Sequence, residues 1–122
     1  MIGYVTLGTR DLTRAAAFYD ALLAEIGAKR AMETERFIMW ATNPAGPGLS
    51  LTKPHDGEPA TVGNGVMVAL AVKAPAEVDR LYAKAIELGA TDEGKPGPRG
   101  GSFYGAYFRD PDGNKLNFFC MG

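Results

Sequence analysis

The chain has 122 residues, of which 46% are hydrophobic and 22% charged, close to the averages of globular proteins. That length can bury one core without disulfides or structural metals. The net charge of −1, with no basic run, gives no electrostatic basis for binding nucleic acid or an anionic membrane. A single cysteine, Cys120, and a start without signal-peptide features lead us to expect one cytoplasmic domain, residues 1–122, with no membrane span.

The first half of the chain predicts the element order βαβββ. Residues 2–8 alternate polar and apolar side chains as a half-buried strand does. Apolar residues then recur at spacings of three and four over residues 12–26, which predicts a helix capped by Thr9 or Asp11 and ended by Gly27. Runs of β-prone residues, the last one after an Asn-Pro-Ala-Gly turn, predict strands at 29–34, 35–42 and about 49–53.

The second half repeats the opening of the first. A stretch rich in Pro and Gly, about 55–64, predicts a linker, and a strand is expected at about 66–73. A helix should begin at Pro75 and end at Gly89. A Gly- and Pro-rich loop is expected over residues 93–101, followed by strands at about 102–109 and 114–120 that an Asp-Pro-Asp-Gly turn joins.

Two like units in so short a chain indicate a pseudo-symmetric fold of tandem βαβββ modules, at about 1–54 and 65–122. Strand alternation gives each module an apolar face for its helix and a second face for a cavity. In the first module, the side chains assigned to the cavity are Tyr4, Thr6, Ser50 and Thr52. In the second, they are Met67, Asn117 and Phe119.

Four stretches resemble the vicinal oxygen chelate superfamily, also called the glyoxalase/bleomycin resistance/dioxygenase fold. They are Val-Thr-Leu-Gly-Thr-Arg-Asp-Leu at 5–12, Ala-Phe-Tyr-Asp at 17–20, Gly-Val-Met-Val-Ala at 65–69 and Phe-Arg-Asp-Pro-Asp-Gly-Asn at 108–114. The resemblance covers nearly the whole chain in the correct order. It implies an α+β fold whose modules form an eight-stranded, U-shaped, mostly antiparallel sheet, with helices on the convex face and a small-molecule cleft on the concave face. It also implies a homodimer.

The same resemblance implies where a metal would bind. Metal-dependent members hold a divalent cation through one side chain, commonly His, Glu or Gln, from the first and the last strand of each module. Carried over to this sequence, those positions are Tyr4, Ser50, Met67 and Asn117. None of them is an imidazole or a carboxylate, the ligands that such cations prefer. We therefore expect no metal site and no cofactor.

The expected cleft combines aromatic side chains with a few groups that form hydrogen bonds, as small-ligand pockets do. Its predicted lining is Tyr4, Thr6, Trp40, Ser50, Thr52, Met67, Tyr107, Asn117 and Phe119. This surface is similar to that of metal-free, drug-sequestering members, which predicts a protein that binds a small organic molecule without a catalytic metal. The alternative is a lyase, isomerase or dioxygenase-type enzyme of the same superfamily, metal-free or with an atypical metal site at Tyr4 and Asn117.

A few residues have simpler interpretations. For Trp40, packing in the core is the simpler interpretation, because large aromatic side chains are buried by default. His55 is expected to be a solvated linker residue and Cys120 a buried apolar one. The segment 95–101 lacks P-loop spacing and is predicted to be a surface loop, from which Arg99 could reach the cleft and attract an anionic ligand.

Overall fold

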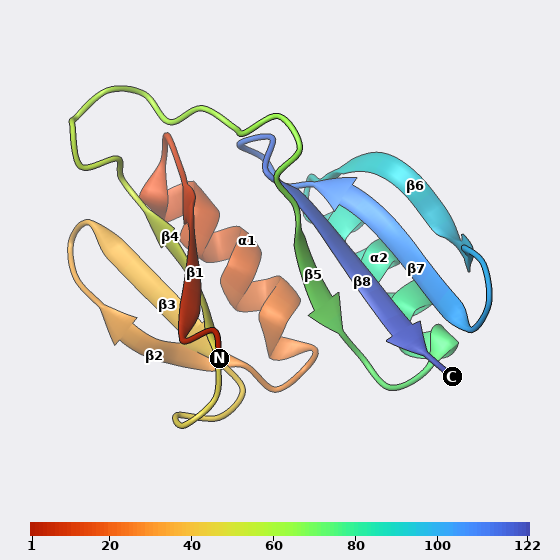
Figure 1. Cartoon of the computed structure of the whole chain (residues 1–122). Coiled ribbons are helices and arrows are strands. Elements are labelled where there is room, and N and C mark those ends of the chain that lie inside the picture. The colour runs from red at the N-terminus through yellow and green to blue at the C-terminus, as the bar shows by residue number, and fades with distance from the viewer. The chain divides into compact units, whose positions relative to one another are not determined.

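The computed structural model describes residues 1–122 and divides the chain into two compact units, Met1–Val62 and Gly63–Gly122 (Figure 1). Each unit contains one strand, one helix and then three strands. This confirms the α+β class and the two βαβββ modules. The joining of the two sheets into one U-shaped sheet stays a prediction. Neither helix is long and apolar enough to cross a membrane.

The first unit is a mixed four-stranded sheet with one helix. Its elements are β1 (Tyr4–Gly8), α1 (Leu12–Ala24), β2 (Lys29–Glu33), β3 (Phe37–Ala41) and β4 (Gly48–Thr52). The strand order is β1-β4-β3-β2, in which β1 runs parallel to β4 and the other pairs are antiparallel. The register pairs Thr6 with Ser50 and Ser50 with Met39, so these three side chains share one face.

Helix α1 begins at Leu12, as predicted, and ends at Ala24, two residues before the predicted end at residue 26. Asp11 is its N-cap, and the carboxylate accepts a hydrogen bond from the Arg14 backbone N–H at 3.1 Å. After the last turn, Gly27 adopts a φ of 80°, a left-handed conformation that other residues adopt at a cost. The apolar stripe of the helix is buried and consists of Leu12, Ala15, Ala16, Phe18, Tyr19, Leu22 and Leu23.

Asp20 ties α1 to two strands of its sheet. Its Oδ1 accepts hydrogen bonds from Trp40 Nε1 at 2.8 Å and Arg30 Nε at 3.0 Å, and its Oδ2 accepts one from Arg30 Nη2 at 2.7 Å. Trp40 is 2% exposed and packs on Tyr19, with the ring centroids 5.6 Å apart. The Arg30 guanidinium, aided by the Trp40 indole, holds the pKa of Asp20 below its usual value.

The second unit has the same arrangement. Its elements are β5 (Val68–Ala71), α2 (Pro75–Glu87), β6 (Thr91–Pro98), β7 (Phe103–Arg109) and β8 (Lys115–Met121). The strand order is β5-β8-β7-β6, with β5 parallel to β8 and the other pairs antiparallel. Pro75 is the first residue of α2, as predicted, and the helix buries Val78, Leu81 and Ala85.

The loop predicted over residues 93–101 is wrong for its first part, because β6 extends to Pro98. The strand lies at the edge of the sheet and pairs only with β7. An edge strand tolerates prolines, because one side of it forms no ladder hydrogen bonds. The pairing of β6 with β7 shifts in register between Asp92 and Gly94 and again between Gly94 and Gly97, as at β-bulges.

Replacing Asp20 by Asn should lower the free energy of unfolding of the first unit by about 1–2 kcal/mol, because the variant loses the charged acceptor shared by Arg30 and Trp40. Urea unfolding followed by the fluorescence of the single tryptophan measures the loss. Glu33→Gln is the control. It removes only an exposed ion pair with Arg30, and we expect it to cost less than about 1 kcal/mol.

The difference between the wild type and Asp20→Asn should also depend on pH. The folded pKa of Asp20 lies below the ordinary 3.8, so the carboxylate contributes its full stability above that value. The contribution is lost as the pH falls through the folded pKa. The two unfolding free energies should therefore converge in acid, and a difference that stays constant under acidification would contradict this role of Asp20.

Candidate functional site

In the first unit, the sheet face opposite α1 carries four of the five cleft residues that were predicted for this unit. Val5, Leu7, Leu49 and Leu51 share the face of Trp40, which bonds to α1 through Asp20. Alternation therefore turns the intervening side chains to the open face. These are Tyr4, Thr6, Ser50 and Thr52, together with Phe37 and Met39 of β3.

Trp40 is the exception among the predicted residues of the first unit. It is buried against Tyr19 and donates its indole N–H to Asp20, so it belongs to the helix-covered core. The prediction that Trp40 lines the cleft is therefore wrong. The physical reason is its register with Leu49, which places both side chains on the face that α1 covers.

The hydroxyl groups of this open face form hydrogen bonds within the chain. Ser50 is fully buried, donates to the Val5 carbonyl at 3.1 Å and lies 2.8 Å from Thr6 Oγ1, which acts as its donor. The Thr52 hydroxyl reaches the Arg36 carbonyl at 3.1 Å. Tyr4 is 59% exposed and meets Phe37 edge to face. The face thus presents aromatic rings beside hydroxyl groups whose O–H groups already donate hydrogen bonds within the chain.

In the second unit, the open face lies along β7 and β8. Leu116 and Phe118 are fully buried, and alternation places Asn117 and Phe119 on the opposite face. Tyr107 pairs with Asn117 across the ladder, so the three predicted residues of these two strands lie together. Phe119 stacks on Phe103, with centroids 5.2 Å apart and an interplanar angle of 3°. Met67 directly precedes β5 and is 41% exposed.

Asn117 is fully buried and only half satisfied. Its Nδ2 donates to the carbonyls of Ala106 at 3.3 Å and Phe118 at 3.1 Å. Its Oδ1 is the single buried side-chain polar atom of the chain without a hydrogen-bond partner. Gly105 makes room for the amide, because a Cβ there would lie 3.0 Å from Nδ2. The Asn117 Oδ1 atom is therefore a buried acceptor on the open face that accepts no hydrogen bond.

A hollow of about 540 Å³ opens at the β6 side of this face. It is lined by Glu93, Gly94, Lys95, Pro96, Arg99, Tyr107 and Lys115. The Tyr107 ring receives two cations, with the Arg99 guanidinium carbon 5.4 Å and the Lys115 ammonium 5.6 Å from its centroid. The sequence identified Tyr107 and Arg99 but missed Lys115. Its position two residues before Asn117 in the last strand was the signal that could have found it.

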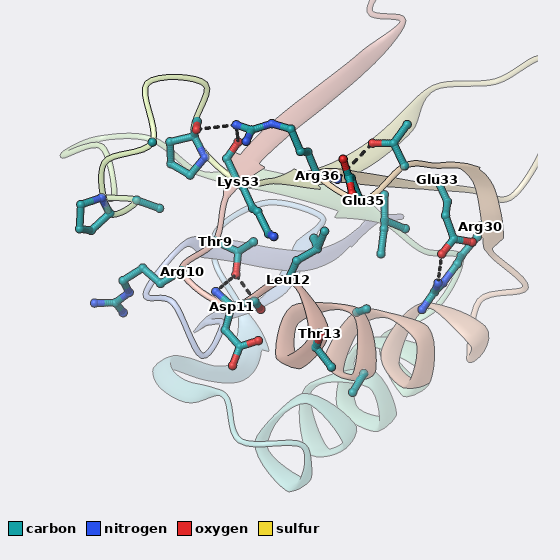
Figure 2. Close-up of a pocket in the computed structure, with 18 of the residues that line it drawn as sticks. Thr9, Arg10, Asp11, Leu12, Thr13, Arg30, Glu33, Glu35, Arg36 and Lys53 are labelled. Atoms are coloured by element: carbon teal, nitrogen blue, oxygen red, sulfur yellow. Dashed lines mark hydrogen bonds and ion pairs between the residues drawn. The ribbon is translucent and has the colours of Figure 1, made fainter.

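A larger groove of about 1120 Å³ lies in the first unit, beside α1 (Figure 2). It is bounded by the start of α1, the turn between β2 and β3, and the segment that follows β4. Two of its arginines have partners within the unit. Arg30 pairs with Glu33 at 2.7 Å, and Arg36 donates to the Pro54 carbonyl at 2.8 Å. None of the predicted cleft residues lines this groove.

The Asp-Pro-Asp-Gly turn has a structural role. The Asp110 carboxylate accepts hydrogen bonds from the backbone N–H groups of Asp112 and Asn114, at 3.0 and 2.9 Å. It also accepts one from the Asn114 side chain at 3.0 Å. Gly113 supplies a φ of 94°. The carboxylate thus closes the turn that sends the chain from β7 into β8 and sets the register that carries Asn117.

The residues at the four family metal positions do not suit a divalent cation. The Ser50 hydroxyl and the Asn117 amino group are committed to hydrogen bonds within the chain. Met67 offers a thioether, which prefers soft cations, and Tyr4 offers an exposed phenol. Only the neutral Asn117 Oδ1 is a free acceptor among buried groups. No group of three or more His, Cys, Asp and Glu side chains converges anywhere in residues 1–122.

Tandem βαβββ modules, each with one helix-covered face and one open face, define a small α+β protein of the glyoxalase type. Residues 1–118 match the Glyoxalase/Bleomycin resistance protein/Dioxygenase superfamily, and the chain belongs to this family. The family predicted from the sequence motifs is thereby confirmed.

Solved structures resemble the chain along its whole length. A glyoxalase/bleomycin resistance protein from Albidiferax ferrireducens is 36% identical with a TM-score of 0.91, and the match covers 100% of this chain and 99% of that one. A hypothetical protein from S. aureus is 28% identical with a TM-score of 0.78, covering 99% and 93%. A lactoylglutathione lyase from Agrobacterium tumefaciens shares the fold at 21% identity, with a TM-score of 0.73 and coverage of 98% and 92%. No curated protein matches the chain.

Asn117→Asp should destabilise the second unit by about 3 kcal/mol or more at neutral pH. The substitution replaces two N–H donors by a buried carboxylate facing the Ala106 and Phe118 carbonyls. Thermal and urea unfolding measure the effect, and acid should restore part of the stability because it neutralises the carboxylate. Ser50→Ala is the matched control at the equivalent strand of the first unit, and we expect it to cost about 1 kcal/mol. Equal, small losses in both variants would contradict this description of Asn117.

Proposed function

We propose that this protein binds a small organic molecule on the open faces of its sheets, without a catalytic metal ion. The observation that carries the proposal is the chemistry at the four metal positions of the family. They hold a phenol, a hydroxyl, a thioether and a carboxamide, and the hydroxyl and the amide already bond within the chain. Such a donor set favours organic ligands over divalent cations.

The composition of the open faces supports the proposal. The second unit presents stacked Phe103 and Phe119 beside Tyr107 and the half-satisfied Asn117 amide. The first unit presents Tyr4 and Phe37 with several hydroxyls, as described above. Aromatic surface with a small number of placed polar groups is the usual character of a small-ligand site. The proposed contacts are the predicted residues without Trp40.

Binding without turnover is the simplest role for these surfaces. The single histidine, His55, is exposed in the segment that follows β4. Cys120 is buried on the helix-covered face, alternating with Phe119. A general base or nucleophile needs an activating partner, and the proposal gives neither residue a catalytic role. The proposed roles are sequestration, transport or sensing of the ligand.

A thermal-shift screen of aromatic metabolites and antibiotics on tag-free, chelator-treated protein tests the proposal. We expect ligands to raise the melting temperature equally with and without chelator, because ligand binding to the folded state stabilises it independently of metal. Metal analysis of the purified protein should give far less than one ion per chain. Stoichiometric Zn, Ni, Fe or Mn whose removal abolishes the ligand shift would contradict the proposal. Chemical conversion of a hit would favour an enzyme instead.

We further propose that the protein is a homodimer, as its family membership implies. Light scattering coupled to size exclusion should give twice the chain mass of 13.0 kDa. A mass of one chain at micromolar concentration would contradict the dimer without affecting the ligand screen.

A further inference from the structure

We propose that the second unit binds the anionic group of an aromatic organic acid, in the hollow where Lys95, Arg99 and Lys115 surround Tyr107. The inference rests on the proposed function, because it assigns a chemical class to the ligand of the same open face. A carboxylate and a phosphate ester share the required chemistry, namely a compact anion attached to a planar apolar body.

The hollow concentrates positive charge that the chain neutralises only in part. Three of its lining residues are cations, and its one carboxylate, that of Glu93, is paired with Arg109 at 3.1 Å. Lys95, Arg99 and Lys115 form no ion pair. The nearby Asp92 carboxylate attracts Lys95 and Arg99 electrostatically, but it forms its hydrogen bonds with the Tyr82 hydroxyl of α2, at 2.8 Å, and with the Gly94 backbone N–H. This concentration of cations stands out in a chain whose net charge is −1.

Arg99 is held in place for an incoming anion. Its guanidinium lies over the Tyr107 ring and donates one hydrogen bond to the Lys95 carbonyl. Gly94 leaves space for both groups, because a Cβ there would lie 3.0 Å from the Tyr107 ring and 3.3 Å from Arg99 Nη2. The remaining guanidinium N–H groups form a planar fork that matches a carboxylate or phosphate. Ordering the side chain before binding reduces the entropy that binding must overcome.

The rest of the face suits an aromatic body. On β8, Lys115, Asn117 and Phe119 lie one after another on the same face. This face therefore carries an ammonium group, then an amide, then a ring that stacks on Phe103. Tyr107 pairs with Asn117 on the neighbouring strand and bridges the two ends. A ligand with its anion at Lys115 would extend its planar part over Tyr107 toward Phe119. The hollow of about 540 Å³ would take the anionic end of such a molecule, and its planar part would pass beyond the hollow's lining toward Phe119.

Calorimetric titration with benzoate and phenyl phosphate, in chelator and at low salt, tests the inference. Benzyl alcohol serves as the neutral probe. The anions should bind at least about tenfold more tightly than benzyl alcohol, and added salt should weaken them because it screens exposed charges. Preference for one anion over the other identifies which group the hollow takes, and either preference supports the site.

Arg99→Gln and Lys115→Gln should each weaken anion binding by about tenfold, because each removes a charged partner. Lys73→Gln is the matched control. It removes the same charge from an exposed lysine of the second unit that does not line the hollow, and affinity should be unchanged. Tyr107→Leu should weaken binding without altering net charge, whereas Tyr107→Phe should keep the ring and most of the affinity.

Three results would overturn the inference: no measurable binding of either anion, equal affinity for benzyl alcohol and the anions, or equal losses in Arg99→Gln and Lys73→Gln. Retained neutral-ligand binding in the last two cases would leave the proposed function intact. A stoichiometric metal would contradict the proposed function alone, because the titrations are performed in chelator.

Discussion

A single helix covers only one face of each four-stranded sheet, and the rest of the account depends on this constraint. Strand alternation sends every second side chain to the helix, where Trp40 and Leu51 in the first unit and Phe118 and Leu116 in the second are buried. Most of the intervening side chains are exposed or half-buried, although Ser50 and Asn117 are fully buried. These exposed and half-buried side chains are the ones that a ligand could contact, and in the second unit they include cations beside Tyr107.

Equivalent positions of the two modules show how the fold treats a polar group on its last strand. Ser50 donates to one carbonyl and accepts from Thr6, so its hydrogen-bonding capacity is largely used. Asn117 anchors its amino group on two carbonyls and leaves its oxygen without a partner. An anionic side chain at Asn117 would lose both anchors. The amide at this position is thus part of the sheet's own hydrogen bonding, which is the physical reason why a carboxylate ligand does not simply replace it.

Much of the fold follows from local signals in the sequence. The Asp11 cap, the Gly27 terminator and Pro75 at the start of α2 each have a direct backbone cause, and alternation alone placed Tyr4, Thr6, Asn117 and Phe119 opposite the helices. Two expectations failed for reasons that local signals do not contain. The prolines of β6 are compatible with a strand only because that strand is at an edge, and Trp40 faces α1 because of its register with Leu49. Edge position and register are properties of pairing across the sheet.

The sequence predicts part of the basic hollow, since Arg99 and Tyr107 are both among the candidate cleft residues. The sequence alone does not predict Lys115 as a member of the hollow, because only the pairing of β7 with β8 brings it to the Tyr107 ring.

Nuclear magnetic resonance of chelator-treated protein titrated with phenyl phosphate most directly tests whether the open face binds an organic ligand without a metal. We predict chemical-shift changes at the Gly94 and Gly105 amides and at the Asn117 side-chain amide. Shifts confined to the groove beside α1, or shifts that require an added divalent metal, would contradict it.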